Sequence, residues 1–204
     1  MRILVACEVS GRVRDAFKHL GHDAWSCDLV PSDTSGPHIL GDVASILADG
    51  WDLLVAHPPC TYLASSGLHW NARRPERYAQ TEHALAFVRL LLDAPIAHIA
   101  LENPIGCIST RIRKPDQIIQ PWQFGADASK ATCLWVKGLP LLKPTDILPG
   151  DRHTRRANQT PSGQNKLGPS ATRQKERSCT YPGIAEAMAT QWGCTTAWLW
   201  GFDP

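Results

Sequence analysis

Trp51-Asp52-Leu53-Leu54-Val55-Ala56-His57-Pro58-Pro59-Cys60 is the stretch of this 204-residue chain that decides its fold. An apolar run of strand length ends there in a turn that two prolines restrict, and the turn presents a cysteine. About forty residues later a second apolar run, 96–101, ends in Glu102-Asn103-Pro104. Open α/β folds place their chemistry at the carboxyl ends of neighbouring parallel strands, so we expect Cys60 and Glu102 to converge on one pocket.

Strand and helix patterns alternate on both sides of that stretch. The helical pattern 75–92 has a proline near its start and an apolar stripe along one side. Such alternation implies parallel strands joined by right-handed crossovers. The predicted fold is therefore α/β, with a Rossmann-like, doubly wound and mostly parallel sheet. Apolar periodicity predicts strands over 2–7, 23–29, 51–56, 96–101 and 130–136, and helices over 11–20, 43–47, 75–92 and 182–192.

Size and composition predict a single domain with an irregular C-terminal part, because 204 residues with 43% hydrophobic content can bury one substantial core. We expect a core over 1–150, a flexible basic loop over 151–180, and a C-terminal helix and tail over 181–204 that pack on the core. The segment 151–177 contains seven Lys or Arg but only two acidic residues, and it has almost no large apolar residues. Such a loop suits a phosphate backbone, although a merely solvated loop has the same composition.

Cysteine usage and hydropathy predict the compartment. Seven scattered cysteines without a C-x-x-C pair indicate neither a zinc site nor a disulfide framework. The sequence has no run of eighteen apolar residues and opens without a cleavable leader pattern. We therefore expect an unexported, cytoplasmic protein that needs no membrane and no metal.

The order of the motifs resembles that of the DNA cytosine-5 methyltransferases, especially small phage-encoded members, which work in the host cytoplasm. The resemblance covers residues 1–105. It implies a class I methyltransferase fold, S-adenosylmethionine as cofactor, and cytosine C5 in DNA as the target. The resemblance depends on Gly11, Asp28, Gly41-Asp42-Val43, Pro58-Pro59-Cys60 and Glu102-Asn103-Pro104. Three later stretches resemble only the phage relatives: 121–125, 130–135 and 180–185.

The resemblance assigns the family's nucleophile to Cys60 and its base-holding glutamate to Glu102. Cytosine is electron-poor at C6, and addition of a soft thiolate there would make C5 able to accept a methyl group. A partly ionised thiol, favoured by exposure and a nearby helix N-terminus, and a Glu102 with a raised pKa would serve this reaction. The resemblance also implies that Pro59 and Asn103 contact the substrate. His57 has either a direct or a structural role, and Glu102 alone could be an ordinary carboxylate at a strand end.

The cofactor residues follow from the same resemblance. Asp28 would accept hydrogen bonds from ribose hydroxyls, Asp42 would contact the adenine amino group, and Pro58 would border the cofactor, although either aspartate could be ordinary turn chemistry. The family's Phe-x-Gly-x-Gly-Gly corresponds to Cys7-Glu8-Val9-Ser10-Gly11-Arg12, which keeps one glycine, Gly11. We expect Glu8 and Ser10 to supply polar contacts in place of the missing glycines.

No separate target-recognition domain follows Glu102, so low sequence specificity is expected. The expected DNA contacts are Arg155 and Arg156 in the basic loop, with Arg111 and Arg113, which could instead face water. Duplex DNA would have to extrude its target base, at a cost of about a few kcal/mol. Three alternatives stay open: an amino-methyltransferase with a related Pro-Pro turn, an enzyme that modifies C5 of a free pyrimidine nucleotide, and a non-catalytic DNA-binding or cofactor-binding protein, which the loss of glycines would favour.

Overall fold

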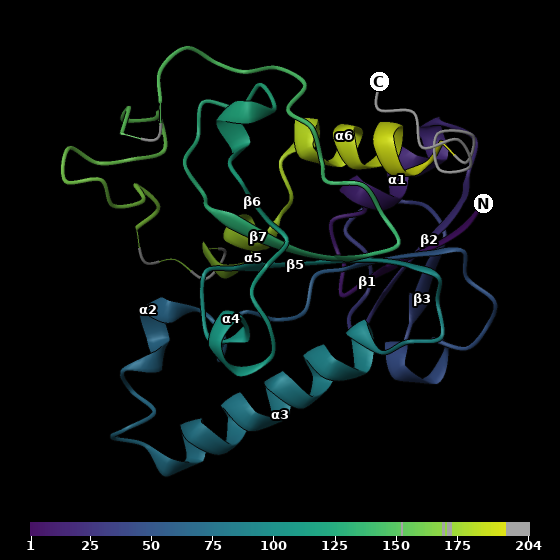
Figure 1. Ribbon diagram of the computed structural model, residues 1–204, viewed down its shortest axis with the longest axis horizontal. Helices are drawn as coiled ribbons and strands as arrows, with labels where there is room; N and C mark the ends of the chain where they lie inside the picture. Colours follow the sequence, from purple (N-terminus) through teal and green to yellow (C-terminus); the bar gives the residue numbers. More distant parts are fainter. Residues whose placement is uncertain (152, 169, 171–172, 195–204) are drawn as a thin grey trace.

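A single seven-stranded sheet in the order β3-β2-β1-β4-β5-β7-β6 forms the centre of the protein (Figure 1). The structure, a computed structural model, describes residues 1–151, 153–168, 170 and 173–194, with only the backbone for 173–175. The expected packing of the tail after 194 lies outside these residues. The strands are β1 (Arg2–Ala6), β2 (Asp23–Asp28), β3 (His38–Leu40), β4 (Leu53–Ala56), β5 (His98–Pro104), β6 (Gln117–Ile119) and β7 (Thr132–Lys137).

β1 to β5 run parallel to one another, whereas β7 runs antiparallel to both β5 and β6. The register aligns Ala6 with Ala56, and Ala56 with Leu101, so β1, β4 and β5 reach the same edge of the sheet together. The residues that follow them therefore gather along one carboxyl edge. The α/β class and the mostly parallel sheet that the sequence predicts are confirmed, and the antiparallel direction of β7 is an addition.

Helices cover both faces of the sheet (Figure 1). The upper face carries α1 (Arg12–His19) and α6 (Pro182–Trp192), which pack against one another, and the lower face carries α3 (Pro75–Leu92) and α4 (Ile108–Arg111). Alternate residues of β1 enter the two cores, Ile3 with the α1 and α6 side and Leu4 with the α3 side. The short elements are η1 (Val43–Ser45), α2 (Ser65–Leu68), η2 (Pro121–Gln123) and α5 (Arg173–Ser178).

The basic segment that follows residue 150 is anchored to the body within its described part. Asn158 exchanges two hydrogen bonds with the backbone of Ser129, at 2.9 and 3.0 Å. The guanidinium of Arg156 lies 4.9 Å from the centre of the Trp122 ring and donates to the carbonyl of Pro149 at 3.1 Å. The mobility expected for 151–180 stays a prediction. No helix in the described ranges is long and apolar enough to cross a membrane.

Candidate active site

The turn after β4 holds Cys60 at the carboxyl edge of the sheet. His57 N–H still donates to the carbonyl of Ala6 at 2.9 Å, so the strand direction continues for one residue into the turn. The carbonyl of Cys60 then accepts from the N–H groups of Leu63 and Ala64, at 3.0 and 2.9 Å. These bonds fix the backbone on both sides of the cysteine, while the residue itself remains exposed. The sequence-predicted nucleophile is therefore presented on a braced turn.

Glu102 lies one strand away, near the end of β5, with a side chain only 12% exposed. Its Oε2 is 3.1 Å from His57 Nδ1. Because an ionised carboxylate can only accept, Nδ1 carries the hydrogen of this bond. The antiparallel direction of β7 brings its first residues beside the end of β5, so the positive charge of Lys130 acts on Glu102. A histidine and a lysine from two other segments thus surround the carboxylate.

The ionisation of the two predicted catalytic groups is opposite to what the sequence suggests. Burial would raise the pKa of Glu102, but the hydrogen bond from His57, the charge of Lys130 and a smaller contribution from Thr132 outweigh it and lower the pKa. The residue as a whole is exposed, but partial burial of its thiol, followed by the negative charge of Glu102, raises the pKa of Cys60, with Lys130 opposing. Both pKa shifts of the unliganded chain therefore run against the protonation that the reaction would use, which is a Glu102 with a raised pKa and a partly ionised Cys60.

Asn103 braces the cysteine turn from β5. The residue is 1% exposed, and its Nδ2 donates to the carbonyl of Pro58 at 2.7 Å. Asn103 Oδ1 and His57 Nε2 are both buried without a hydrogen-bond partner among the described residues. Such atoms are costly, and ligands often supply the missing partner. The substrate contacts predicted for Asn103 and the exposed Pro59 stay predictions.

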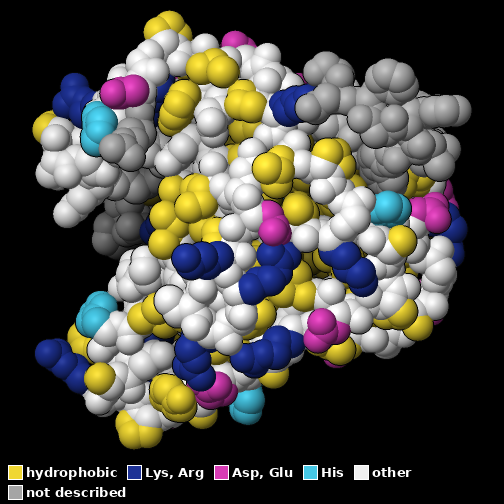
Figure 2. Space-filling model, viewed as in Figure 1, with side chains coloured by type: hydrophobic (Ala, Val, Ile, Leu, Met, Phe, Trp, Pro, Cys, Tyr) yellow, Lys and Arg dark blue, Asp and Glu magenta, His cyan; other side chains and the backbone are white. Residues whose placement is uncertain are grey.

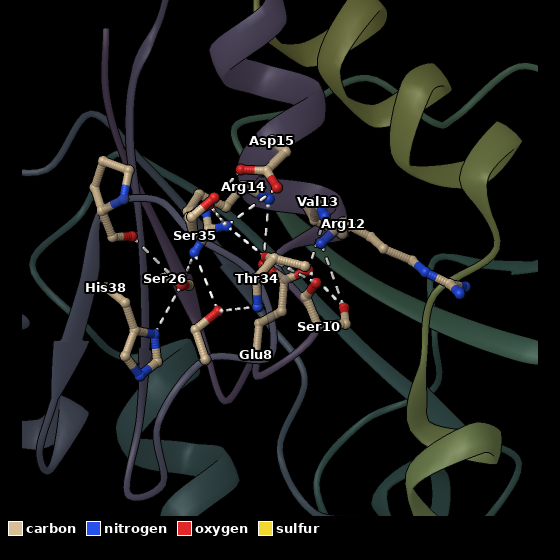
Figure 3. Close-up of polar contacts among 12 residues, drawn as sticks. Glu8, Ser10, Arg12, Val13, Arg14, Asp15, Ser26, Thr34, Ser35 and His38 are labelled. Atoms are coloured by element: carbon tan, nitrogen blue, oxygen red, sulfur yellow. Dashed lines mark hydrogen bonds and ion pairs between the residues drawn. The ribbon is translucent and has the colours of Figure 1, made fainter.

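The first strand-to-helix turn is closed from inside by Glu8 (Figure 3). Glu8 is 5% exposed, and its carboxylate accepts from the N–H groups of Val13 and Arg14, at 2.7 and 3.2 Å, and from Ser10 Oγ at 3.2 Å. It therefore satisfies the free N–H groups at the start of α1. Gly11 has φ +70°, and a Cβ there would collide with the side chains of Thr34 and Arg14. Glu8 and Ser10 thus replace the missing glycines by capping the helix, and their cofactor contacts stay a prediction.

Arg14, which the sequence interpretation missed, is fully buried behind that turn (Figure 3). Its guanidinium bonds to Asp15 on its own helix at 2.8 Å, and it ties α1 to β2 and to the loop 29–37. A polar residue on an amphipathic helix normally faces water, so its position in the sequence gave no signal. The remaining partners of the guanidinium are Ser26, Ser32, Thr34 and the carbonyl of Ser35, at 3.1, 3.3, 2.8 and 3.1 Å.

Asp28 ends β2, and Asp42 follows the end of the neighbouring strand β3. Asp28 Oδ1 accepts from Val30 N–H at 3.2 Å, and Asp42 Oδ1 accepts from Ala44 N–H at 2.9 Å. Burial, with a smaller effect of both carboxylates, raises the pKa of Cys7 to about 12, which places these groups around one point. The described hydrogen bonds leave the second oxygen of each aspartate free. Two acceptors at adjacent strand ends fit the hydroxyl and amino donors of a nucleoside, and their negative charge suits a sulfonium cation.

The four arginines predicted to bind the substrate come from two segments, Arg111 and Arg113 after β5 and Arg155 and Arg156 after residue 150. Arg111 pairs with Glu82 at 2.8 Å and Arg113 with Asp116 at 2.7 Å. Both line a hollow of about 520 Å³ beside the start of β5 and the end of β7, where basic side chains gather in Figure 2. Arg155 is exposed, whereas Arg156 is only 5% exposed. None of these contacts places Arg111 or Arg113 at the Cys60 turn, and DNA binding by the four stays a prediction.

The chain is similar in fold to solved structures, but not to any family profile or curated protein. Among the solved structures with a similar fold is a proposed DNA modification methyltransferase encoded within an Escherichia coli prophage. The two chains are 14% identical, with a TM-score of 0.44, and the match covers 72% of this chain and 51% of that one. This chain therefore spans about half the length of that protein.

Proposed function

We propose that this chain is an S-adenosylmethionine-dependent methyltransferase with a doubly wound, Rossmann-like class I fold, and that it methylates C5 of cytosine in DNA through a covalent adduct with Cys60. The observation that carries the proposal is the pairing of an exposed Cys60 with the carboxylate of Glu102 at one sheet edge. The order of motifs in the sequence supports the same chemistry. The aspartates at the neighbouring strand ends support the cofactor.

The proposed reaction uses the cysteine and the glutamate on opposite sides of the base. Cys60 Sγ forms a bond to C6, and the electron pair of the C5–C6 double bond moves toward N3, where Glu102 holds the ring. S-adenosylmethionine, held by Asp28 and Asp42, would supply an electrophilic methyl group for C5 and would itself be released as the thioether S-adenosylhomocysteine. A base removes the C5 proton, the Sγ–C6 bond breaks, and the double bond returns with release of the thiolate.

In this proposal, one proton moves from the thiol of Cys60 to the carboxylate of Glu102. The free chain favours a neutral Cys60 and an ionised Glu102. Glu102 as an acid could donate a hydrogen bond to N3, and its neutralisation would remove one cause of the raised pKa of Cys60. Transfer of the thiol proton to Glu102, directly or through water, leaves the total charge unchanged. Binding of the base would therefore activate the nucleophile, and the enzyme would keep an unreactive thiol when no base is present.

The test is a denaturing gel with an oligonucleotide that contains 5-fluorocytosine, incubated with S-adenosylmethionine. Fluorine cannot leave C5 as a cation, so the adduct should persist and shift the protein band. We expect a shift for the wild type and for Cys194→Ser, which removes another exposed thiol, and none for Cys60→Ser. Absence of the shift in the wild type with both ligands present would contradict the proposal.

A second candidate is a non-catalytic DNA-binding protein with the same fold. The inward capping role of Glu8 favours it, because that carboxylate is committed to the start of α1. Equilibrium dialysis with labelled S-adenosylmethionine separates the two candidates, since the methyltransferase should bind it and Asp28→Ala/Asp42→Ala should not. If the cofactor binds, incubation with DNA or with dCMP identifies the substrate that receives the label.

A further inference from the structure

Residues 61–80, which we call the arm, follow Cys60 directly and stand out from the body. The arm contains α2 and the first turns of α3, and Figure 1 shows it projecting beyond the sheet. Its base is held by Arg77, which donates to the carbonyls of Thr61 and Gly67 at 2.8 and 3.2 Å. Thr81 Oγ1 also donates to the carbonyl of Tyr62 at 3.0 Å. The arm is therefore a braced projection that starts at the nucleophile.

The tip of the arm combines an exposed indole with two cations. Trp70 is 39% exposed. The guanidinium of Arg74 lies 5.0 Å from the centre of its ring and that of Arg73 lies 5.8 Å away. No ion pair among the described residues involves Arg73 or Arg74. Basic side chains are visible on this projection at the lower left of Figure 2. The tip thus presents net positive charge around a flat aromatic surface.

This combination fits a nucleic acid strand better than a protein surface. Unpaired bases stack on aromatic rings regardless of their sequence, and arginines neutralise the adjoining phosphates. An acidic peptide would use the two cations but would leave the indole without a stacking partner. The tip differs in this respect from the hollow lined by Arg111 and Arg113, where both guanidinium groups already have carboxylate partners.

We infer that Trp70, Arg73 and Arg74 form a stacking platform for an unpaired DNA strand, whose neighbouring nucleotide enters the Cys60 site. The identity of that nucleotide rests on the proposed function, whereas binding to the platform does not. The platform binds single strands more tightly than duplex, because paired bases do not expose a face to the indole. It also supplies DNA contacts that the sequence interpretation looked for only in the segment after residue 150 and at Arg111 and Arg113.

The experiment is a fluorescence anisotropy titration of the full chain with a short labelled single-stranded oligonucleotide at several salt concentrations. We expect Trp70→Ala to weaken binding at least about fivefold, and Trp70→Phe to retain most of the affinity because it keeps a ring. Arg73→Ala/Arg74→Ala should lower the slope of log K against log salt by about 1.4. The matched control is Lys18→Ala/Lys143→Ala, which removes two exposed cations away from the Cys60 edge and should preserve affinity and slope. Circular dichroism checks that each variant is folded.

Two outcomes would overturn the platform. One is equal affinity of Trp70→Ala and the wild type, and the other is a salt slope of the arginine variant equal to that of the lysine control. Adduct formation on 5-fluorocytosine DNA separates this inference from the proposed function. A wild type that forms the adduct while the arm variants bind like the control refutes the platform alone. Arm variants that lose binding while the wild type forms no adduct refute the proposed function and support the platform.

Discussion

Replacement of His57 by leucine tests how the carboxylate of Glu102 is held. The change removes the 3.1 Å hydrogen bond from His57 Nδ1 and keeps a side chain of similar volume. The two side chains are only 9% and 12% exposed, so water cannot readily replace the lost donor. A hydrogen bond to a charged group contributes about 1.5–3 kcal/mol. We expect that loss in the free energy of unfolding at neutral pH, without collapse of the fold, because Lys130 still faces Glu102.

The pH dependence gives the expected sign. The pKa of Glu102 is lower in the folded chain than in the unfolded chain. Its contribution to stability is therefore present above the unfolded pKa and disappears as the pH falls through the folded pKa. The gap between wild type and His57→Leu should be largest near neutrality and should shrink below about pH 4, where unfolded glutamate is mostly protonated.

The assay is urea unfolding followed by tryptophan fluorescence at neutral and acidic pH. His57→Gln serves as the matched control, because its side-chain amide can donate to Glu102 and should restore part of the stability. A His57→Leu variant that is as stable as the wild type at neutral pH would refute the interpretation of the pair. A gap of the same size at both pH values would also refute it, since the effect would then come from packing.

Three further predictions concern the first turn. Gly11→Ala should destabilise the chain by more than Gly21→Ala. Both glycines have a positive φ, so alanine costs about 1–2 kcal/mol of backbone strain at either position, but only at Gly11 would the added Cβ also collide with neighbouring atoms. Thermal unfolding of both variants measures the difference. Arg14→Met should cost at least about 2 kcal/mol in urea unfolding, since it leaves buried acceptors unpaired, whereas Lys18→Met on the exposed side of α1 should cost less than about 0.5 kcal/mol. The free energy of unfolding should decline as the pH rises from the ordinary thiol pKa of 9.0 toward 12, because the folded chain keeps the Cys7 proton that the unfolded chain loses. Cys7→Ala should make this decline less steep. A Cys7→Ala variant with the same pH curve as the wild type would contradict the raised pKa of Cys7.

The parallel half of the sheet could be predicted because its strands are continuous apolar runs. β1 and β4 are buried on both sides, and such runs are typical of the centre of a parallel sheet. The pattern of β7 is similar, but apolar periodicity does not encode strand direction, so the sequence left its antiparallel course open. β3 and β6 have three residues each, too few to show a period.

The placement of the candidate site could be predicted in outline only. The rule that chemistry lies at the carboxyl edge of parallel strands was enough to bring Cys60 and Glu102 together. Their pKa shifts could not be predicted, because they depend on His57 and Lys130, which belong to separate elements and meet only in the folded chain. The burial of Arg14 was hidden for the same reason, since its partners follow in the loop after β2.

The packing of α6 on α1 has a consequence for biosynthesis. Phe17 and the strand residues beneath it share a core with Met188 and Trp192, which the ribosome adds about 170 residues later. Until α6 has left the exit tunnel, α1 covers only part of that side of the nascent sheet, and the rest offers an apolar surface to chaperones or to other nascent chains. Ribosomes stalled just before α6 should therefore carry an aggregation-prone chain, and the upper face should reach protease resistance only after that helix is released.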